Sequence, residues 1–180
     1  MRLENMVQKH LDTGADLTLA VKPVRAEETS RFGIMGVDNQ GRVVSFIEKP
    51  KPEALGAYLL TEEARRAIGF DGQGDWYLAS MGMYVFTKQL LYSMLETDRP
   101  DFGSDIIPLC VASKQVVPFL HHGYWEDIGT VRTFYEANLS LAWPRPPFNF
   151  YDEERPIYTR ARFLPRSEEH TSELQSPNTI

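Results

Sequence analysis

The residues with the clearest chemical potential lie at 124–130, where two aromatic side chains precede two adjacent carboxylates, a glycine and a threonine. Gly129 allows a sharp turn and Thr130 is a favourable helix N-cap, so Asp127 is expected at a junction that opens a helix. A single aspartate in such a place can hold Mg²⁺ together with phosphate oxygens and water. The alternative is that Asp127 only caps the helix while Glu126 is solvated. The pattern leaves both interpretations open.

Two further groups of residues are candidates for binding a ligand. Glu48 and Lys49 end an expected strand just before a proline, and adjacent opposite charges at such a position are ordinarily a surface ion pair. Ser80 and Gly82 lie in the middle of a long β-like run, where small residues indicate close strand packing or the approach of a ligand. By contrast, residues 72–74 lack the third glycine and the following helix of a phosphate-binding loop, so we interpret them as an ordinary loop.

The pattern of apolar residues predicts the helices and strands that must position these candidates. Residues 3–11 have helical spacing, and the short, partly β-branched run 17–21 predicts a buried strand. Two apolar segments, 32–37 and 42–47, flank Asp38-Asn39-Gln40-Gly41, which is a hairpin signal. The other expected elements are helices at 61–68, at 88–95, from Ser104 through Val111 and from Val131, and strands at 76–86 and 115–120. The alternation of helices and strands predicts the α/β fold class.

Composition narrows the class of protein. The 180 residues are 42% hydrophobic and 24% charged, which fits one soluble globular domain with a real core. A net charge of -6 without a run of Lys and Arg argues against nucleic acid as a partner. Cys110 is the only cysteine and lies in an apolar run, so we expect a core position and a reducing compartment. No window reaches the ~20 apolar residues of a membrane span and no signal pattern opens the chain, so we expect no membrane partner and a cytoplasmic location.

The composition changes after Trp143. Residues 144–165 combine prolines with aromatic side chains, which predicts an extended linker towards another domain. Residues 166–180 have no periodicity and little apolar surface to bury, and they resemble the translation of a sequencing-library adapter. We therefore expect this tail to lie outside the fold, and His170 is not considered as a metal ligand.

Five motifs occur in an order that one enzyme family shares. They are Arg31-Phe32-Gly33, Phe46-Ile47-Glu48-Lys49-Pro50, Tyr77-Leu78-Ala79-Ser80-Met81-Gly82, Asp101-Phe102-Gly103-Ser104-Asp105-Ile106-Ile107-Pro108 and Tyr124-Trp125-Glu126-Asp127-Ile128-Gly129-Thr130. Together they resemble ADP-glucose pyrophosphorylase (glucose-1-phosphate adenylyltransferase) over nearly all of residues 1–165. Glu-Lys-Pro and Trp-Glu-Asp-Ile-Gly-Thr alone would fit other sugar nucleotidyltransferases. The run 101–108, together with a linker similar to the family's lead into a C-terminal β-helix domain, favours the ADP-glucose branch.

The resemblance implies a role for each of five residues. Glu48 would bind sugar hydroxyls and Lys49 the sugar phosphate, while Gly33 and Ser80 would line the glucose pocket. Asp127 would be one of two aspartates that hold Mg²⁺, so Lys49 and Asp127 are the predicted catalytic residues. The residue types agree with these roles, because a carboxylate accepts hydrogen bonds from hydroxyls, an ammonium is a compact partner for phosphate, and small residues leave room for a sugar ring.

The implied fold is part of a Rossmann-like nucleotide-sugar transferase domain, a mixed sheet with helices on its faces, with the sugar-phosphate-binding part at 1–143. The implied reaction converts ATP and glucose 1-phosphate into ADP-glucose and pyrophosphate in glycogen or starch biosynthesis, and the implied parent enzyme is a homotetramer. The alternatives are another sugar-1-phosphate nucleotidyltransferase and a non-catalytic regulatory subunit, although Lys49, Ser80 and Asp127 argue against lost function. The family's nucleotide loop and second metal aspartate would lie upstream of Met1, so we expect residues 1–180 alone to show no turnover.

Overall fold

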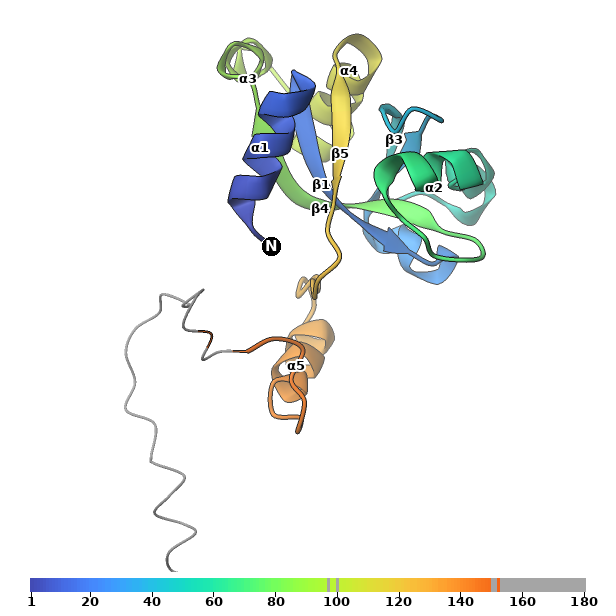
Figure 1. The fold of residues 1–180 in the computed structure, drawn as a ribbon, viewed down its shortest axis with the longest axis vertical. Helices are drawn as coiled ribbons and strands as arrows, with labels where there is room; N and C mark the ends of the chain where they lie inside the picture. Colours follow the sequence, from blue (N-terminus) through green and yellow to red (C-terminus); the bar gives the residue numbers. More distant parts are fainter. Residues whose placement is uncertain (97, 100, 150–151, 153–180) are drawn as a thin grey trace, which may run out of the picture. The chain divides into compact units, whose positions relative to one another are not determined.

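The computed structural model describes residues 1–96, 98–99, 101–149 and 152. They form two units, Met1–Asp127 and a second unit that begins at Ile128 (Figure 1). The elements of the first unit are α1 (Leu3–Thr13), β1 (Leu17–Val24), the 3₁₀-helix η1 (Ala26–Arg31), β2 (Gly33–Val37), β3 (Val43–Glu48), the 3₁₀-helix η2 (Pro52–Tyr58), α2 (Glu62–Ile68), β4 (Tyr77–Phe86), α3 (Lys88–Leu95), the π-helix η3 (Phe102–Ile106), α4 (Ile107–Ser113) and β5 (Val116–Leu120). The second unit contains α5 (Val131–Ser140).

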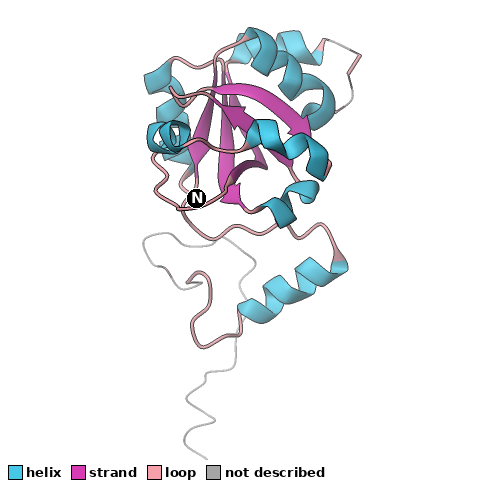
Figure 2. Cartoon of the chain, turned by 90° about the vertical axis from the view of Figure 1, so that its right-hand side faces the viewer, coloured by secondary structure: helices cyan, strands magenta, loops and turns pink. Residues whose placement is uncertain are grey.

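The first unit is built on one sheet with the strand order β3-β2-β4-β1-β5. β1 pairs with β5 in parallel and with β4 in antiparallel orientation, and β2 pairs antiparallel with both β3 and β4. Figure 2 shows these strands side by side with helices around them. The predicted α/β class with a mixed sheet is therefore confirmed.

β1 is buried on both faces, which explains why its sequence is almost continuously apolar. Leu19 and Val21 belong to the larger core cluster, to which α2, α3 and α4 also contribute. Ala20 points to the opposite face, where it packs with Met6 of α1 and Met81 of β4. β1 is thus fixed by packing on both faces between its neighbours β4 and β5.

Local sequence signals place most element ends. Gly14 adopts the left-handed conformation, with φ of +58°, and ends α1. In the hairpin of β2 and β3, Gly41 has a φ of +79°, and the Asp38 carboxylate accepts hydrogen bonds from the backbone N–H of Gln40 and Arg42. The predicted hairpin is therefore confirmed, and α3 spans the predicted residues 88–95.

The predicted helix from Ser104 through Val111 is wrong in two respects. Asp101, not Ser104, takes the N-cap position, and its carboxylate accepts hydrogen bonds from the backbone N–H of Ser104 at 2.6 Å and from the Ser104 hydroxyl at 2.9 Å. The first turn is π-helical, and the α-helix begins only at Ile107. Aspartate is as good a cap as serine, and here one carboxylate satisfies two donors of the serine.

The remaining expectations concern single positions and the chain beyond the sheet. Cys110 is fully buried in the core, as predicted, and burial raises the pKa of its thiol. Thr130 is the predicted N-cap of α5, and its hydroxyl accepts a hydrogen bond from the Thr133 N–H at 3.1 Å. Within the described ranges, no helix is both long enough and apolar enough to cross a membrane. The expected linker from residue 150 onward, apart from Asp152, and the expected tail at 166–180 lie outside the described residues.

Candidate functional site

Three of the predicted site residues lie in a row across adjacent strands. Glu48, the last residue of β3, is the register partner of Gly33, the first residue of β2. The next residue of β2, Ile34, is paired with Ala79 of β4, so Ser80 lies level with Gly33 on its other side. The antiparallel order β3-β2-β4 thus brings Glu48, Gly33 and Ser80 together, and Lys49 follows directly where β3 ends.

The Glu48 carboxylate occupies space that is open because residues 33 and 103 are glycines. A Cβ atom at Gly33 would lie 2.8 Å from Glu48 Oε2 and would also overlap the ring of Phe46. A Cβ atom at Gly103, in η3, would lie 2.9 Å from the same oxygen. Neither position can hold a larger residue unless Glu48 moves. Gly33 was predicted to leave room for a sugar ring, and the room that it leaves in this structure is taken by Phe46 and Glu48.

The Glu48 carboxylate shares its surroundings with other acidic groups. Burial raises the pKa of Glu48, the Lys49 ammonium, 3.8 Å from Glu48 Oε1, opposes this rise, and the Asp101 carboxylate adds to it. Burial also raises the pKa of the Tyr84 phenol, a hydrogen bond with Ser80 lowers it, and the charges of Glu48 and Asp101 raise it further. The arrangement is a group of oxygen acceptors with one ammonium beside it.

Tyr84 and Asp101 belong to this group, although they are not among the predicted site residues. Tyr84 follows Ser80 on β4, and their register partners on β1 are two residues apart, so both side chains lie on the same face. The irregularity between them contains Gly82, whose φ is +72° and whose N–H donates to Ser80 Oγ at 3.3 Å. Phe102 stacks on Tyr84 with ring centroids 6.2 Å apart, and this contact places the neighbouring Asp101 beside the sheet. Strand alternation could have suggested Tyr84, whereas the position of Asp101 depends on tertiary packing.

Lys49 has an unusual backbone conformation. Its φ is +46°, which no other non-glycine residue in the described ranges approaches, since no other has a positive φ. The Lys49 N–H donates to Phe32 O at 3.0 Å and fixes the turn after β3. A left-handed lysine carries roughly 1–2 kcal/mol of strain, and such strain clusters at functional sites. The side chain is 65% exposed, so its ammonium is accessible to a ligand.

Asp127 is connected to the same site through a short segment that starts at Arg31. Arg31 Nη2 donates a hydrogen bond to Asp127 O at 3.2 Å and lies 3.7 Å from Asp127 Oδ2. The next residue, Phe32, packs on Trp125 with ring centroids 5.4 Å apart, and its carbonyl accepts the hydrogen bond from Lys49. One short segment therefore contacts both Lys49 and the residues around Asp127.

The oxygen atoms around Asp127 determine which metal could bind there. Within the described ranges, no group of three or more His, Cys, Asp or Glu side chains could enclose a metal ion. The Asp127 side chain is 41% exposed, and Glu126 lies next to it in the chain. This donor set fits Mg²⁺, which keeps several waters and takes phosphate oxygens in addition to one or two carboxylates.

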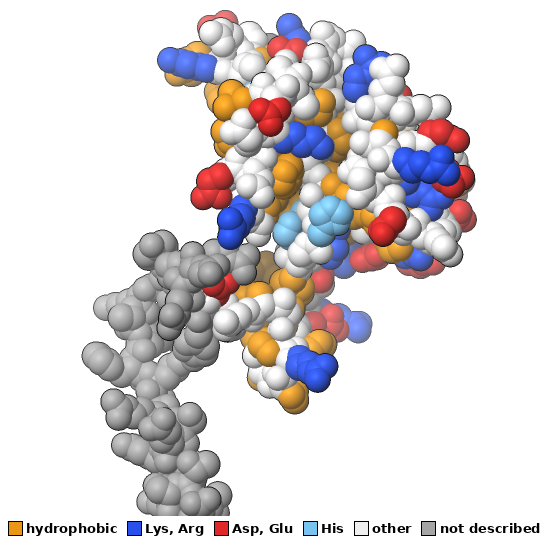
Figure 3. Space-filling model, in the orientation of Figure 1, with side chains coloured by type: hydrophobic (Ala, Val, Ile, Leu, Met, Phe, Trp, Pro, Cys, Tyr) orange, Lys and Arg blue, Asp and Glu red, His pale blue; other side chains and the backbone are white. Residues whose placement is uncertain are grey.

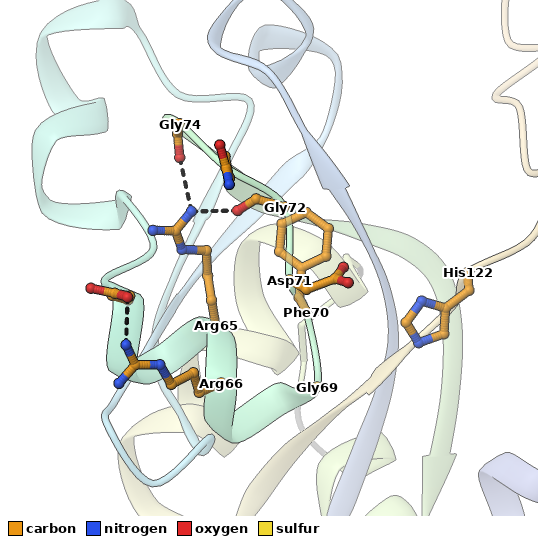
Figure 4. A pocket seen from close by; sticks show the side chains of 10 residues that line it. Arg65, Arg66, Gly69, Phe70, Asp71, Gly72, Gly74 and His122 are labelled. Atoms are coloured by element: carbon orange, nitrogen blue, oxygen red, sulfur yellow. Dashed lines mark hydrogen bonds and ion pairs between the residues drawn. The ribbon is translucent and has the colours of Figure 1, made fainter.

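A separate hollow of about 740 Å³ lies beside α2 and the glycine-rich loop that follows it (Figure 4). Arg65 Nη1 donates hydrogen bonds to Gly72 O and Gly74 O and so holds the loop, while Arg66 pairs with Glu62 one turn away. Both guanidinium groups thus have protein partners, and none of the five predicted site residues lines the hollow. Acidic and basic side chains are interspersed on the face in Figure 3. We therefore interpret the side chains around the hollow beside α2 as a support for the glycine-rich loop.

The sequence matches the family model described as Nucleotidyl transferase over residues 1–143. The matched residues include all five strands of the sheet and all five predicted site residues. The match spans most of the chain, and this protein therefore belongs to the nucleotidyl transferase family.

Proposed function

We propose that this protein acts on a sugar 1-phosphate, and specifically that it converts ATP and glucose 1-phosphate into ADP-glucose and pyrophosphate. Family membership supports nucleotidyl transfer. One observation supports a sugar phosphate as the substrate: the Glu48 and Asp101 carboxylates lie close to the accessible Lys49 ammonium. A molecule with several hydroxyl donors and one phosphate group is complementary to this arrangement. The preference for ATP and glucose is supported by the motif at 101–108 and the resemblance described above.

The reaction requires no protein nucleophile, because the phosphate of the sugar attacks the α-phosphorus of ATP and pyrophosphate leaves. Glu48, with Ser80 in the same row, would fix the sugar, and Lys49 would orient its phosphate and offset its charge. Mg²⁺, when held by Asp127, would stabilise the charge on the transferring phosphoryl group. The residues of this chain would therefore contribute positioning and electrostatic stabilisation. The product would be an activated glucose donor for glycogen or starch synthesis.

Titration calorimetry of the purified chain with glucose 1-phosphate tests the sugar-phosphate assignment. Lys49→Ala should weaken binding by about tenfold or more, since a hydrogen bond between charged groups is worth about 1.5–3 kcal/mol. Lys51→Ala is the matched control, because Lys51 is an exposed lysine two residues further along, and it should leave the affinity unchanged. Equal affinities in the wild type and Lys49→Ala would refute the phosphate assignment.

Turnover assays test the reaction and the role of Asp127. The full-length gene product should form ADP-glucose from ATP and glucose 1-phosphate, and Asp127→Asn should lower kcat by about 10²-fold, as expected for loss of a preorganised electrostatic contact. Asp12→Asn, at an exposed position of α1, should have no effect. A preference for another nucleotide or sugar phosphate would favour a different sugar nucleotidyltransferase. Binding of glucose 1-phosphate without turnover of any substrate would favour a regulatory subunit.

A further inference from the structure

The segment that carries Asp127 has no regular secondary structure of its own. After β5, residues 121–129 form neither helix nor strand. Two cations from other elements reach its backbone: Lys22 Nζ, on β1, donates to Trp125 O at 3.0 Å, and Arg31 Nη2, on η1, donates to Asp127 O at 3.2 Å. Two carbonyl groups that are two residues apart are thus held from two separate elements.

These hydrogen bonds differ in effect from the ion pairs beside them. Arg31 Nη2 lies 3.6 Å from Glu126 Oε1 and 3.7 Å from Asp127 Oδ2, and the three side chains are 37%, 39% and 41% exposed. Exposed ion pairs of this length restrict a side chain little. A charged donor on a carbonyl oxygen makes a stronger and more directional contact, which fixes the backbone. Arg31 therefore contacts Asp127 through its main chain as well as through its side chain.

Lys22 makes a second contact with the same segment. Its Nζ lies 6.0 Å from the centroid of the Trp125 ring, and that ring packs on Phe32 at 5.4 Å. Lys22 is half-buried, and an ammonium removed from water needs an acceptor, which Trp125 O provides. Trp125 is consequently anchored by its ring and by its carbonyl at once, directly before the two carboxylates.

We propose that Lys22 and Arg31 are positioning residues, which hold the carbonyls of Trp125 and Asp127 so that the Asp127 carboxylate keeps a fixed direction during nucleotidyl transfer. This role rests on the proposed function of Asp127. Neither residue is placed at the sugar phosphate, and each acts through the backbone of residues 121–129. Loss of either should loosen this segment and slow turnover, while the affinity of the row on β3, β2 and β4 for sugar phosphate stays the same.

Native-state proteolysis reports on the segment without any catalysis. Lys22→Met and Arg31→Met keep an unbranched apolar stem and remove the charge. Arg42→Met is the matched control, because Arg42 pairs with the Asp38 carboxylate at 2.8 Å in the hairpin turn. Chymotrypsin should cleave after Trp125 about tenfold faster in the first two variants than in the wild type, since cleavage follows local opening. The control should be cleaved at the wild-type rate.

Kinetics of the full-length gene product provide the second readout. In Lys22→Met and Arg31→Met, kcat should fall about tenfold or more while the KM for glucose 1-phosphate stays unchanged, and Arg31→Lys should recover part of the loss. Wild-type cleavage in both methionine variants would overturn the proposal, and so would a rise in KM equal to the fall in kcat. Faster cleavage combined with wild-type kcat in Asp127→Asn would support the anchoring of the segment and overturn the proposed role of Asp127.

Discussion

Replacing Gly103 by alanine tests how the Glu48 carboxylate is placed. The new Cβ atom would lie 2.9 Å from Glu48 Oε2, 3.3 Å from Glu48 Cδ and 3.4 Å from Asp101 Oδ1. The first of these distances is too short for a carbon next to an oxygen, so the carboxylate has to move. The backbone does not oppose the change, because Gly103 lies within η3 and does not have a positive φ.

Gly103→Ala should raise the stability of the protein and lower its affinity for glucose 1-phosphate. A helical glycine replaced by alanine gains up to about 1 kcal/mol in the free energy of unfolding, and the end of the Glu48 side chain can rotate away at little cost. The displaced carboxylate would lose charged hydrogen bonds to the sugar, which are worth about 1.5–3 kcal/mol. Since about 1.4 kcal/mol is a factor of ten, the affinity for glucose 1-phosphate should fall by about 10- to 150-fold.

Calorimetric titration with glucose 1-phosphate and thermal unfolding of the same samples measure both quantities. Gly56→Ala is the matched control, because a Cβ atom there has no neighbour within 4 Å, and it should leave the affinity unchanged. Glu48→Ala is titrated in parallel. If it loses affinity while Gly103→Ala binds like the wild type, the clash between the new methyl group and the carboxylate is refuted. If neither variant loses affinity, the assignment of Glu48 to the sugar is wrong.

Three other substitutions test separate features. The free energy of unfolding should be about 1 kcal/mol higher for Lys49→Gly than for Lys49→Ala, because glycine adopts the φ of +46° without strain. Equal stabilities of the two variants in denaturant titrations would show that the turn is not strained. Glu48→Gln should raise the melting temperature at neutral pH but not below the ordinary carboxyl pKa of 4.5. Because folding raises the pKa of Glu48, the protein loses stability as the pH rises through that raised pKa, and glutamine avoids this loss. Melting curves from about pH 4 upward, with the exposed Glu63→Gln as control, check this expectation, and a benefit that does not depend on pH would contradict the reasoning. Arg65→Met should lower the free energy of unfolding by about 1–2 kcal/mol, because it removes two hydrogen bonds that hold the glycine-rich loop. Arg66→Met removes one exposed ion pair and should lower it by about 0.5 kcal/mol or less. Equal losses in denaturant titrations of the two variants would refute the role of Arg65.

Features that depend on neighbours in the chain could be predicted from the sequence. Gly14 and Gly41 end a helix and turn a hairpin because only a residue without a side chain adopts their positive φ freely. Thr130 caps α5 because its hydroxyl reaches an N–H three residues later. The cap at Asp101 was predicted wrongly, since two capping residues stand three positions apart and sequence alone does not say which one begins the turn.

Features that depend on tertiary packing could not be predicted. Nothing in the run Glu48-Lys49-Pro50 indicates that the lysine takes a left-handed conformation, which follows from its hydrogen bond to Phe32 O. The approach of Asp101 to Glu48 requires the stacking of Phe102 on β4. Similarly, Arg31 has no sequence signal that links it to Asp127, which follows it by 96 residues.

The strand order has a consequence for the way the chain is made. β1 lies between β4 and β5, and the Asp16 carboxylate just before it accepts a hydrogen bond from the N–H of Gln115, 99 residues later. At synthesis rates of about 5–20 residues per second, β1 is synthesised roughly 5–20 s before β5. The hairpin of β2 and β3 can close locally in that interval, whereas the apolar strand 17–24 waits with an unpaired edge. A nascent chain stalled before residue 116 should therefore recruit a chaperone at this strand, and release of that chaperone should coincide with the emergence of β5.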